Sequence, residues 1–477
     1  MPTIKTDVFG GILPKVHPTL LPPECAVRAH NCRLHSGKLV PLRQPSRVSG
    51  SLRLESGLAR IADAKSICLW HGAAGRSEWL AWPGIVTVAR GNIADDELRR
   101  IFVSGDTGIG GGGKNEPGAF IMSKDGLSFT RHTLVKASLP APVATRTEGA
   151  PLDVDNRRFT YFFQTWADRW GYESAPSPRS TNTYPDDEND DGDFIYNDGD
   201  EVTVAALPSA DTPAGAVKRK IYKAVAGSGP EADGIMLVAQ QDIIGQGFQD
   251  FTFRVKDGDA GGSIPMYQSP PEDLDLMTCV TGGFYAGVSR SRPRTVMFSE
   301  TNIPTSWPVA YRIDMPDNIV SLAVVGNTVY VLTDGCPRAV SGLSPDTMAD
   351  TGIPSPQACV SPRSVCVMEN AAFYASHDGI VMLSPELGAA AKVITEQSLS
   401  KDEWAALNPA SCVMAGYDGA LLAWFTPRGA GSAQGHIIDL RAGKTAAITT
   451  NDEVAQAVHY DAAEDALYYV RTGVGTS

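Results

Sequence analysis

The stretch YASHDGIVML at 374–383 decides how this sequence is interpreted. A short apolar run enters an Asp-Gly pair and a second apolar run leaves it. The same pattern occurs in VLTDGCPRAV at 331–340 and in MAGYDGALLAWF at 414–425. Asp-Gly pairs tolerate the positive φ angles of tight turns, and the flanking residues are β-branched or aromatic. The sequence therefore predicts a β-hairpin that the chain builds repeatedly.

The hairpin returns at a regular interval. Successive aspartates at 334, 378, 418 and 461 are about 40–45 residues apart, which is the size of a four-stranded propeller blade. A single blade cannot bury both of its faces, whereas a ring of blades closes the core and leaves only short edges. We therefore expect a β-propeller, with a regularly spaced array of β-sandwiches as the alternative. Hairpins at 66–84 and 119–134 fit the same ring.

Helical periodicity is almost absent from the chain. The exception is 399–407, where Ser400 is a candidate N-cap and Glu403 completes a capping box. The sequence thus predicts an all-β protein with one short helix.

The region 149–262 does not follow the repeat of about 40–45 residues. About seven short strands follow one another there, which is typical of an immunoglobulin- or fibronectin-like β-sandwich. The predicted fold is a β-propeller body with this sandwich inserted. The predicted domains are N-terminal propeller blades at 1–148, the inserted sandwich at 149–262 and C-terminal propeller blades at 263–477.

Composition narrows the function classes. The chain has 477 residues and a net charge of −13, and an acidic balance argues against gripping the phosphates of a nucleic acid. No run of about 18 apolar residues exists, so no membrane span is expected. The N-terminus lacks the charged and apolar regions of a secretory signal. Eight thinly spread cysteines predict reduced thiols in a cytoplasmic product.

Two motifs resemble ligand sites. GIGGGGKN at 108–115 is close to a phosphate-binding loop, but Asn115 stands where Ser or Thr should hold magnesium, and EPG follows where a helix should start. A plain glycine loop is the expectation there. DENDDGDFIYND at 187–198 matches a calcium loop, with a solvated acidic loop as the competing interpretation. Its candidate Ca²⁺ ligands are Asp187, Asn189, Asp191, Asp193 and Asp198.

Other constellations predict no chemistry. Cys25, His30, Cys32 and His35 are crowded together, but their spacing matches no common zinc pattern. Cys359 and Cys366 are expected to be core residues. Three single carboxylates are candidates for a propeller glycosidase, but the sequence gives no reason to pair them. They are Glu300, Asp314 and Glu369. We expect no catalytic residue and no cofactor apart from the calcium loop.

Two stretches resemble a known family. The opening at 9–45 resembles the start of bacteriophage tail nozzle proteins of the tail tubular protein B type. The stretches 297–314, 319–342 and 357–383 are similar to the middle of such podovirus-type virion proteins. The residues that carry the first resemblance are Gly10, Gly11, Leu21, Pro22, Ala26, Ala29, Asn31, Gly37, Leu39 and Leu42. The two stretches cover about a quarter of the chain, which is shorter than the nozzle proteins.

The resemblance implies a structural role in a phage tail. It implies a ring of identical subunits, a homohexamer, below the portal and its adaptor and in contact with tail fibre or tail tip proteins. Viral DNA would be retained above the ring and would leave through its lumen without specific binding. Such a protein is assembled in the cytoplasm of the bacterial host and resides in the virion tail.

Two other functions stay open. The first is a host-surface adhesin, in which the sandwich or a propeller face binds glycan and Trp70, Trp79 and Trp82 form a sugar platform. The second is a propeller glycoside hydrolase. Hairpin core is the competing interpretation for the three tryptophans.

Overall fold

A computed structural model describes the chain and divides it into two compact units. Unit 1 comprises 1–133, 272–302 and 310–477, and unit 2 comprises 134–271 and 303–309. The residues that the structure describes are 9–35, 38–55, 57–72, 77–91, 96–110, 114–122, 129–148, 151–152, 158–182, 194–208, 211–213, 215–224, 234–243, 247–256, 261–388, 390–428, 434–441 and 446–471.

Unit 1 is a series of small sheets joined by short turns. Most contain four antiparallel strands in sequence order: β6–β9, β19–β22, β23–β26, β27–β30 and β31–β34. A mixed sheet of β3, β5 and β4 precedes them, and the pair β35–β36 ends the series. Their strands are β3 (Ser51–Leu54), β4 (Ser66–His71), β5 (Ser77–Trp82), β6 (Val86–Arg90), β7 (Ile101–Gly105), β8 (Gly118–Met122), β9 (Phe129–Thr133), β19 (Leu274–Val280), β20 (Phe284–Ser289), β21 (Arg292–Phe298), β22 (Arg312–Asp314), β23 (Ile319–Val325), β24 (Thr328–Thr333), β25 (Arg338–Ser341), β26 (Ala349–Gly352), β27 (Cys366–Met368), β28 (Ala371–Ala375), β29 (Ile380–Leu383), β30 (Lys392–Val393), β31 (Val413–Tyr417), β32 (Ala420–Phe425), β33 (Gln434–Asp439), β34 (Ala447–Asn451), β35 (Ala455–Asp461) and β36 (Ala466–Arg471).

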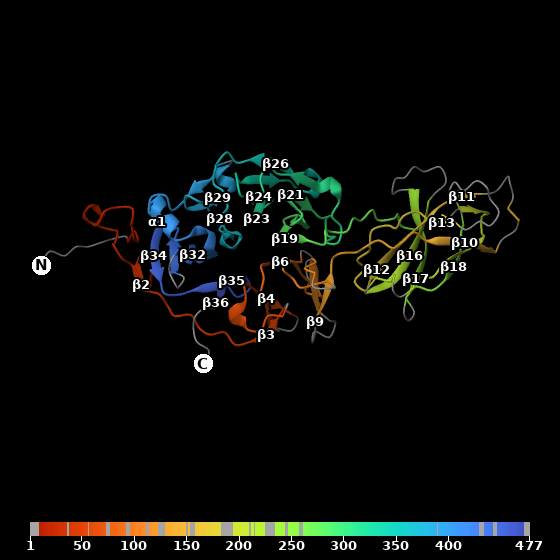
Figure 1. Cartoon of the computed structure of the whole chain (residues 1–477), viewed down its shortest axis with the longest axis horizontal. Helices are drawn as coiled ribbons and strands as arrows, with labels where there is room; N and C mark the ends of the chain where they lie inside the picture. The colour runs from red at the N-terminus through yellow and green to blue at the C-terminus, as the bar shows by residue number, and fades with distance from the viewer. Residues whose placement is uncertain are drawn as a thin grey trace. The chain divides into compact units, whose positions relative to one another are not determined.

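Apolar side chains between neighbouring sheets close this series into a ring. One cluster joins β4 and β5 to β6–β8, and others join β19–β22 to β23–β26, β23–β26 to β27–β30, and β27–β30 to β31–β34. Two further clusters join β35–β36 to the sheet before it and back to β4 and β5, through Ala457 and Ala81. Unit 1 is therefore a β-propeller, and Figure 1 shows its sheets following one another around a common centre.

The turns explain why the hairpins form. Asp418 and Gly419 have φ values of 49° and 67° and are the two residues between β31 and β32. Glu369 and Asn370, with φ values of 47° and 61°, connect β27 and β28 in the same way. Two consecutive positive φ angles match the right-handed twist of the paired strands, so these turns set the register of these two hairpins.

The aspartates used to infer the repeat do not occupy equivalent turns. Asp334 and Asp378 lie in the second turn of their sheets, whereas Asp418 lies in the first, and Asp461 is the last residue of β35. The true repeat is that of the first strands, which begin at Leu274, Ile319, Cys366, Val413 and Ala455. The units recur at about the predicted interval, but the aspartate that marks them lies in the second turn of two sheets and in the first turn of the next.

The predicted helix is present as α1 (Lys401–Ala406). Ser400 accepts the N–H of Glu403, and the Glu403 carboxylate accepts the N–H of Ser400, which confirms the capping box. Trp404 anchors the helix, because its indole N–H donates to Ser376 O and its ring packs edge-on against Phe425. The helix fills a gap between two blades.

Unit 2 contains a four-stranded sheet, a three-stranded sheet and a two-stranded pair. Their orders are β13-β10-β15-β18, β12-β16-β17 and β11-β14. Phe162, Phe194, Val202 and Ile221 come from all three sheets and share one buried core. The strands are β10 (Val143–Glu148), β11 (Arg158–Thr160), β12 (Phe162–Asp168), β13 (Thr181–Asn182), β14 (Phe194–Tyr196), β15 (Glu201–Val204), β16 (Ala216–Ala224), β17 (Ile235–Asp242) and β18 (Phe251–Arg254).

The boundaries of unit 2 differ from the predicted ones. The chain enters the unit at Leu134 and not at 149, because β10 pairs with β13 and β15. It leaves after Pro271 and not after 262, because Gln268 accepts the N–H of Trp307 on its carbonyl and that of Val309 on its side chain. The Pro-rich segment 261–271 is thus part of the unit.

A ladder of serines covers the free edge of β12. Ser174, Ser177 and Ser180 are buried, and each exchanges two hydrogen bonds with one strand residue. The backbone N–H of each serine donates to the carbonyl of one residue of β12, and the serine hydroxyl accepts the N–H of that same residue. The partners of Ser174, Ser177 and Ser180 are Trp166, Gln164 and Phe162, in that order. The serines are three residues apart, a spacing typical of polyproline-like chain, whereas their partners on β12 are two residues apart, as in any strand. The hydrogen bonds connect these two different periods.

Candidate functional site

The ring closes where β35 packs against β4, and a buried carboxylate lies at this closing seam. Asp461 has no exposed surface. Its Oδ1 accepts a hydrogen bond from Nη2 of Arg90 at 2.9 Å, and Nε2 of His71 lies 2.9 Å from the same oxygen. Its Oδ2 accepts the N–H of Glu464. The carboxylate therefore joins β35 to two other sheets.

The charges of this seam follow from its environment. Burial by itself raises the pKa of Asp461, but the close approach of His71, the Glu464 N–H and the Arg90 guanidinium outweigh it, so the pKa lies below the usual value. Burial lowers the pKa of His459 to about 4. The seam thus combines a charged carboxylate with a neutral imidazole at neutral pH.

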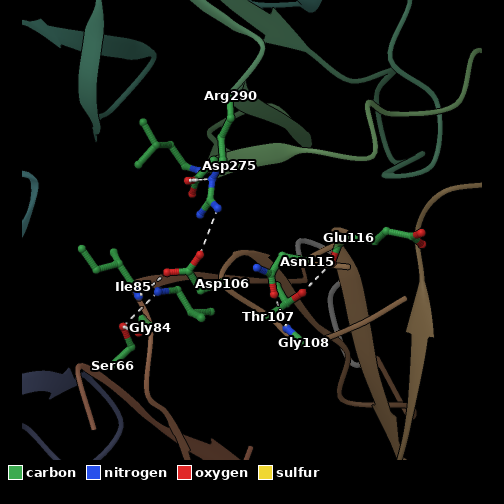
Figure 2. A network of polar contacts seen from close by, with 12 residues as sticks. Ser66, Gly84, Ile85, Asp106, Thr107, Gly108, Asn115, Glu116, Asp275 and Arg290 are labelled. Carbon is green, nitrogen blue, oxygen red and sulfur yellow. Dashed lines mark hydrogen bonds and ion pairs between the residues drawn. The ribbon is translucent and has the colours of Figure 1, made fainter. Parts of the chain in front are cut away.

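A second polar network lies where the chain leaves unit 1 and returns to it. Arg290 donates from Nε to Asp275 Oδ2 at 2.8 Å, and its Nη1 lies 2.9 Å from Asp106 Oδ1, as Figure 2 shows. Asp106 also accepts the N–H of Ile85. Ser104 accepts the N–H of Met277 from the adjoining sheet. These contacts join β6–β9 to β19–β22 across the interruption in the sequence.

The two described ends of the glycine loop at 108–115 belong to the same region and contact each other, whereas 111–113 lie outside the described residues. Asn115 Oδ1 accepts the N–H of Gly108 at 2.9 Å, and Thr107 donates to Glu116 O at 2.7 Å (Figure 2). The loop connects strand β7 to strand β8, so no helix N-terminus faces it. Lys114 pairs with Glu272 at 2.8 Å. The described ends of the loop thus make the contacts of a structural connection between two strands.

The N-terminal segment 10–31, which we call the strap, lies on β34. Ile12 bridges Ile448, and the N–H of Asn31 donates to Thr450 O. Gly11 has a φ of +81°, and a Cβ there would lie 2.5 Å from the backbone nitrogen of Ile448. Only glycine permits this close approach. Asn31, with a positive φ of 53°, donates from its side chain to Asp452.

The calcium loop falls mostly outside the described residues. Four of its five candidate ligands lie outside the described residues: Asp187, Asn189, Asp191 and Asp193. The fifth, Asp198, is described and is exposed in the turn after β14. That turn is closed by a residue the sequence reasoning missed, Asp200, which accepts the N–H of Asn197 and pairs with Arg146.

The candidate zinc ligand His30 and the three candidate sugar-binding tryptophans all contact other residues of the protein. His30 contacts Thr450 and Asp452 through its two nitrogens, so its imidazole is already engaged. Trp70 and Trp82 are buried in the hairpin core, as their competing interpretation held. Trp79 packs edge-on against Tyr468. These contacts argue against a sugar platform.

The three candidate carboxylates lie on separate elements, and two of the cysteines are buried. Asp314 lies on the edge strand β22 and accepts Thr295 Oγ1, whereas Glu369 lies in a turn of another sheet. Glu300 follows β21. Burial raises the pKa of Cys359 and of Cys366 to about 12, so both thiols stay protonated.

Unit 2 carries an apolar cavity of about 390 Å³. Aromatic rings form much of its wall, together with the polyproline-like segment that holds the serine ladder. The aromatic residues are Tyr161, Phe163 and Tyr267. Tyr161 and Phe163 meet edge to face, with ring centroids 5.4 Å apart. Aromatic walls of this kind suit an apolar or sugar ligand.

Comparisons with known proteins reach the fold alone. No family model and no curated protein matches the sequence. Among solved structures, the chain is similar to apo AztD from Citrobacter koseri (13% identity, 62% of this chain and 69% of that one, TM-score 0.20). It is similar to the WD40 domain of SCAP from fission yeast (8%, 75% and 65%, TM-score 0.27). It is also similar to the β-propeller domain of the Trilobed protease from Pyrococcus furiosus (6%, 79% and 89%, TM-score 0.28).

The propeller assignment rests on the sheet order and cores of unit 1 and does not depend on these matches. Within the described residues, no helix is long and apolar enough to cross a membrane.

Proposed function

We propose that this protein is a structural component of a phage tail, a nozzle ring below the portal and adaptor. The observation that best supports this proposal is the N-terminal strap. Gly10, Gly11, Ala26, Ala29 and Asn31, which underlie the resemblance to tail nozzle proteins, all make backbone contacts in or through this strap. The motif thus has a structural role, attaching the start of the chain to the outer strand of a blade.

The seams support a mechanical role. Two of the places where distant parts of the sequence meet in unit 1 are held by arginine–carboxylate pairs, Arg90–Asp461 and Arg290–Asp106. Charge-assisted contacts of this kind fix orientation as well as distance. A propeller built this way is suited to carry the pressure of packaged DNA.

We further propose that unit 2 is an immunoglobulin- or fibronectin-like β-sandwich inserted into the propeller. Its four- and three-stranded sheets contribute to one shared core, as the two faces of a sandwich do. In the ring it would supply the surface that meets neighbouring subunits, the adaptor or tail fibre proteins.

In this proposal the protein is a virion component assembled in the bacterial cytoplasm, and six copies form the ring. The net charge of −13 fits a lumen that viral DNA passes without adhering, since like charge repels phosphate.

Phage particles test the proposal directly. An amber mutation in the gene should yield capsids that package DNA but lose it, measured as DNA that becomes sensitive to nuclease. Complementation by the wild-type gene should restore retention, and cryo-EM of the restored particles should show the protein as a ring around the tail axis. Particles that retain their DNA without the protein, or purified virions that lack it, would rule the proposal out.

The aromatic cavity of unit 2 favours one second function, a glycan-binding adhesin. In that case the free protein should bind host cells and block phage adsorption. Tyr161→Ala should abolish the block, and Arg179→Ala, an exposed change in the same unit, should not.

A further inference from the structure

The closing seam brings together a set of metal-ligating atoms that the proposed function does not require. His71 on β4, Asp461 at the end of β35, and Glu464 in the following turn each offer one ligand atom, and these atoms lie within 4.8 Å of one another. The three residues come from positions far apart in the sequence and meet only because the ring closes here.

One contact in this cluster is unsatisfied. Nε2 of His71 is buried and lies 2.9 Å from Asp461 Oδ1 in an ion-pair contact, but the contact is not aligned as a hydrogen bond. The nearby His459 Nε2 is also buried without a hydrogen-bond partner. A buried imidazole nitrogen that accepts or donates no hydrogen bond costs free energy, and coordination of a cation would remove that cost.

The donor set selects the kind of ion. One imidazole nitrogen and two carboxylate oxygens suit Zn²⁺ and similar transition metals, whereas Ca²⁺ and Mg²⁺ prefer shells made of oxygen alone. We infer that the closing seam is a site for a divalent transition-metal ion, with His71, Asp461 and Glu464 as its protein ligands. The ion would clip the last sheet of the propeller to the first.

Arg90 is the competing cation at this seam. Its Nη2 lies 2.9 Å from Asp461 Oδ1, but its side chain is 56% exposed. A bound ion can therefore displace the guanidinium into water without burying an unpaired charge. Glu464 is exposed too, and its Oε2 accepts a hydrogen bond from the hydroxyl of Tyr468, so the ion would be bound through a carboxylate that Tyr468 already holds near the seam.

Metal titration of the full chain tests this inference. After removal of metal with a chelator, the wild-type protein should bind one more equivalent of Zn²⁺ than His71→Gln or Glu464→Gln, measured by calorimetry. Asp465→Asn is the matched control, because Asp465 lies in the same turn but accepts Tyr460 OH. It should bind as the wild type does.

Two further measurements separate this site from adventitious binding. The eight cysteines can take up Zn²⁺, but they do so equally in all variants. With Co²⁺ the extra equivalent should give weak visible bands and no thiolate charge-transfer band. Zn²⁺ should also raise the thermal midpoint of the wild type and not that of Glu464→Gln, and Mg²⁺ should leave both unchanged.

Equal Zn²⁺ uptake by the wild type and Glu464→Gln would overturn the inference, as would an equal rise of the midpoint with Mg²⁺. Glu464→Gln decides the question even if His71→Gln fails to fold, because Glu464 is exposed and its backbone N–H to Asp461 is retained.

Discussion

The guanidinium of Arg90 donates a hydrogen bond to the carboxylate of Asp461 although the two residues are 371 positions apart. The contact links β6 with β35 and crosses the point where the propeller returns to its start. Asp461 is wholly buried, so the bond is shielded from water on the side of the carboxylate. The stability of the ring therefore depends on residues that no local sequence pattern connects.

Replacing Arg90 with Ala should destabilise unit 1. The buried Asp461 would lose its charge-assisted hydrogen bond, and we expect a cost of about 1–2 kcal/mol, reduced by the partial exposure of the arginine. The midpoint of urea unfolding, measured without metal, checks this. Arg60→Ala is the control, because Arg60 pairs only with its neighbour Asp63 on the surface, and its effect should stay within about 0.5 kcal/mol.

Replacing Gly11 with Ala should release the N-terminal strap. The added Cβ would lie 2.5 Å from the Ile448 nitrogen, so the strap must move away from β34. Gly57→Ala is a matched control, because Gly57 has a φ of +75° but nothing within 4 Å of the added Cβ. Limited proteolysis should cleave the strap faster in Gly11→Ala alone. Equal cleavage of both variants would show that φ, and not the close approach, determines the effect.

Acid should destabilise the protein through His436 on β33. Burial lowers its pKa to about 4, whereas the unfolded value is near 6.5. The unfolded chain therefore binds a proton first, so stability falls as the pH drops from about 6.5 to about 4, by up to about 3 kcal/mol. Above about pH 6.5 the residue contributes no pH dependence. His436→Gln should make the profile of unfolding free energy less steep across this window, with His459, whose pKa is also about 4, accounting for part of the remaining slope. An unchanged profile would contradict the assignment.

Removing one step of the serine ladder should weaken unit 2. Ser177→Ala leaves the buried N–H of Gln164 without its side-chain acceptor, at a cost of about 1–3 kcal/mol. Arg179→Ala, two residues later and exposed, should be close to neutral. Hydrogen exchange at the Gln164 amide reports the change directly. Slow exchange at that amide in Ser177→Ala would mean that the ladder does not protect the edge.

The sequence predicts the propeller because turn chemistry is local. Asp418-Gly419 marks a positive-φ turn wherever it occurs, and its flanking strands are apolar on both faces. The same chemistry cannot tell the first turn of a blade from the second, which is why Asp334 and Asp418 are taken as equivalent although they are not. That distinction depends on which strand lies innermost, and packing between blades decides it.

The domain boundary and the seam are beyond sequence reasoning for another reason. β10 is an unremarkable alternating segment, and only its pairing with β15 assigns it to unit 2. His71, Arg90 and Asp461 carry no shared spacing, because ring closure alone brings them together. The serine ladder, by contrast, leaves a readable signal, since Ser174, Ser177 and Ser180 recur every third residue between prolines.

The strap also has a consequence for synthesis of the protein. His30 contacts Thr450, which lies 420 positions later. The strap is therefore translated long before its partner strand, and it can dock only after β34 has been made. Until then the edge of β34 does not exist and Ile12 stays in water. Docking of the strap therefore reports that β34 has been made and has joined its sheet.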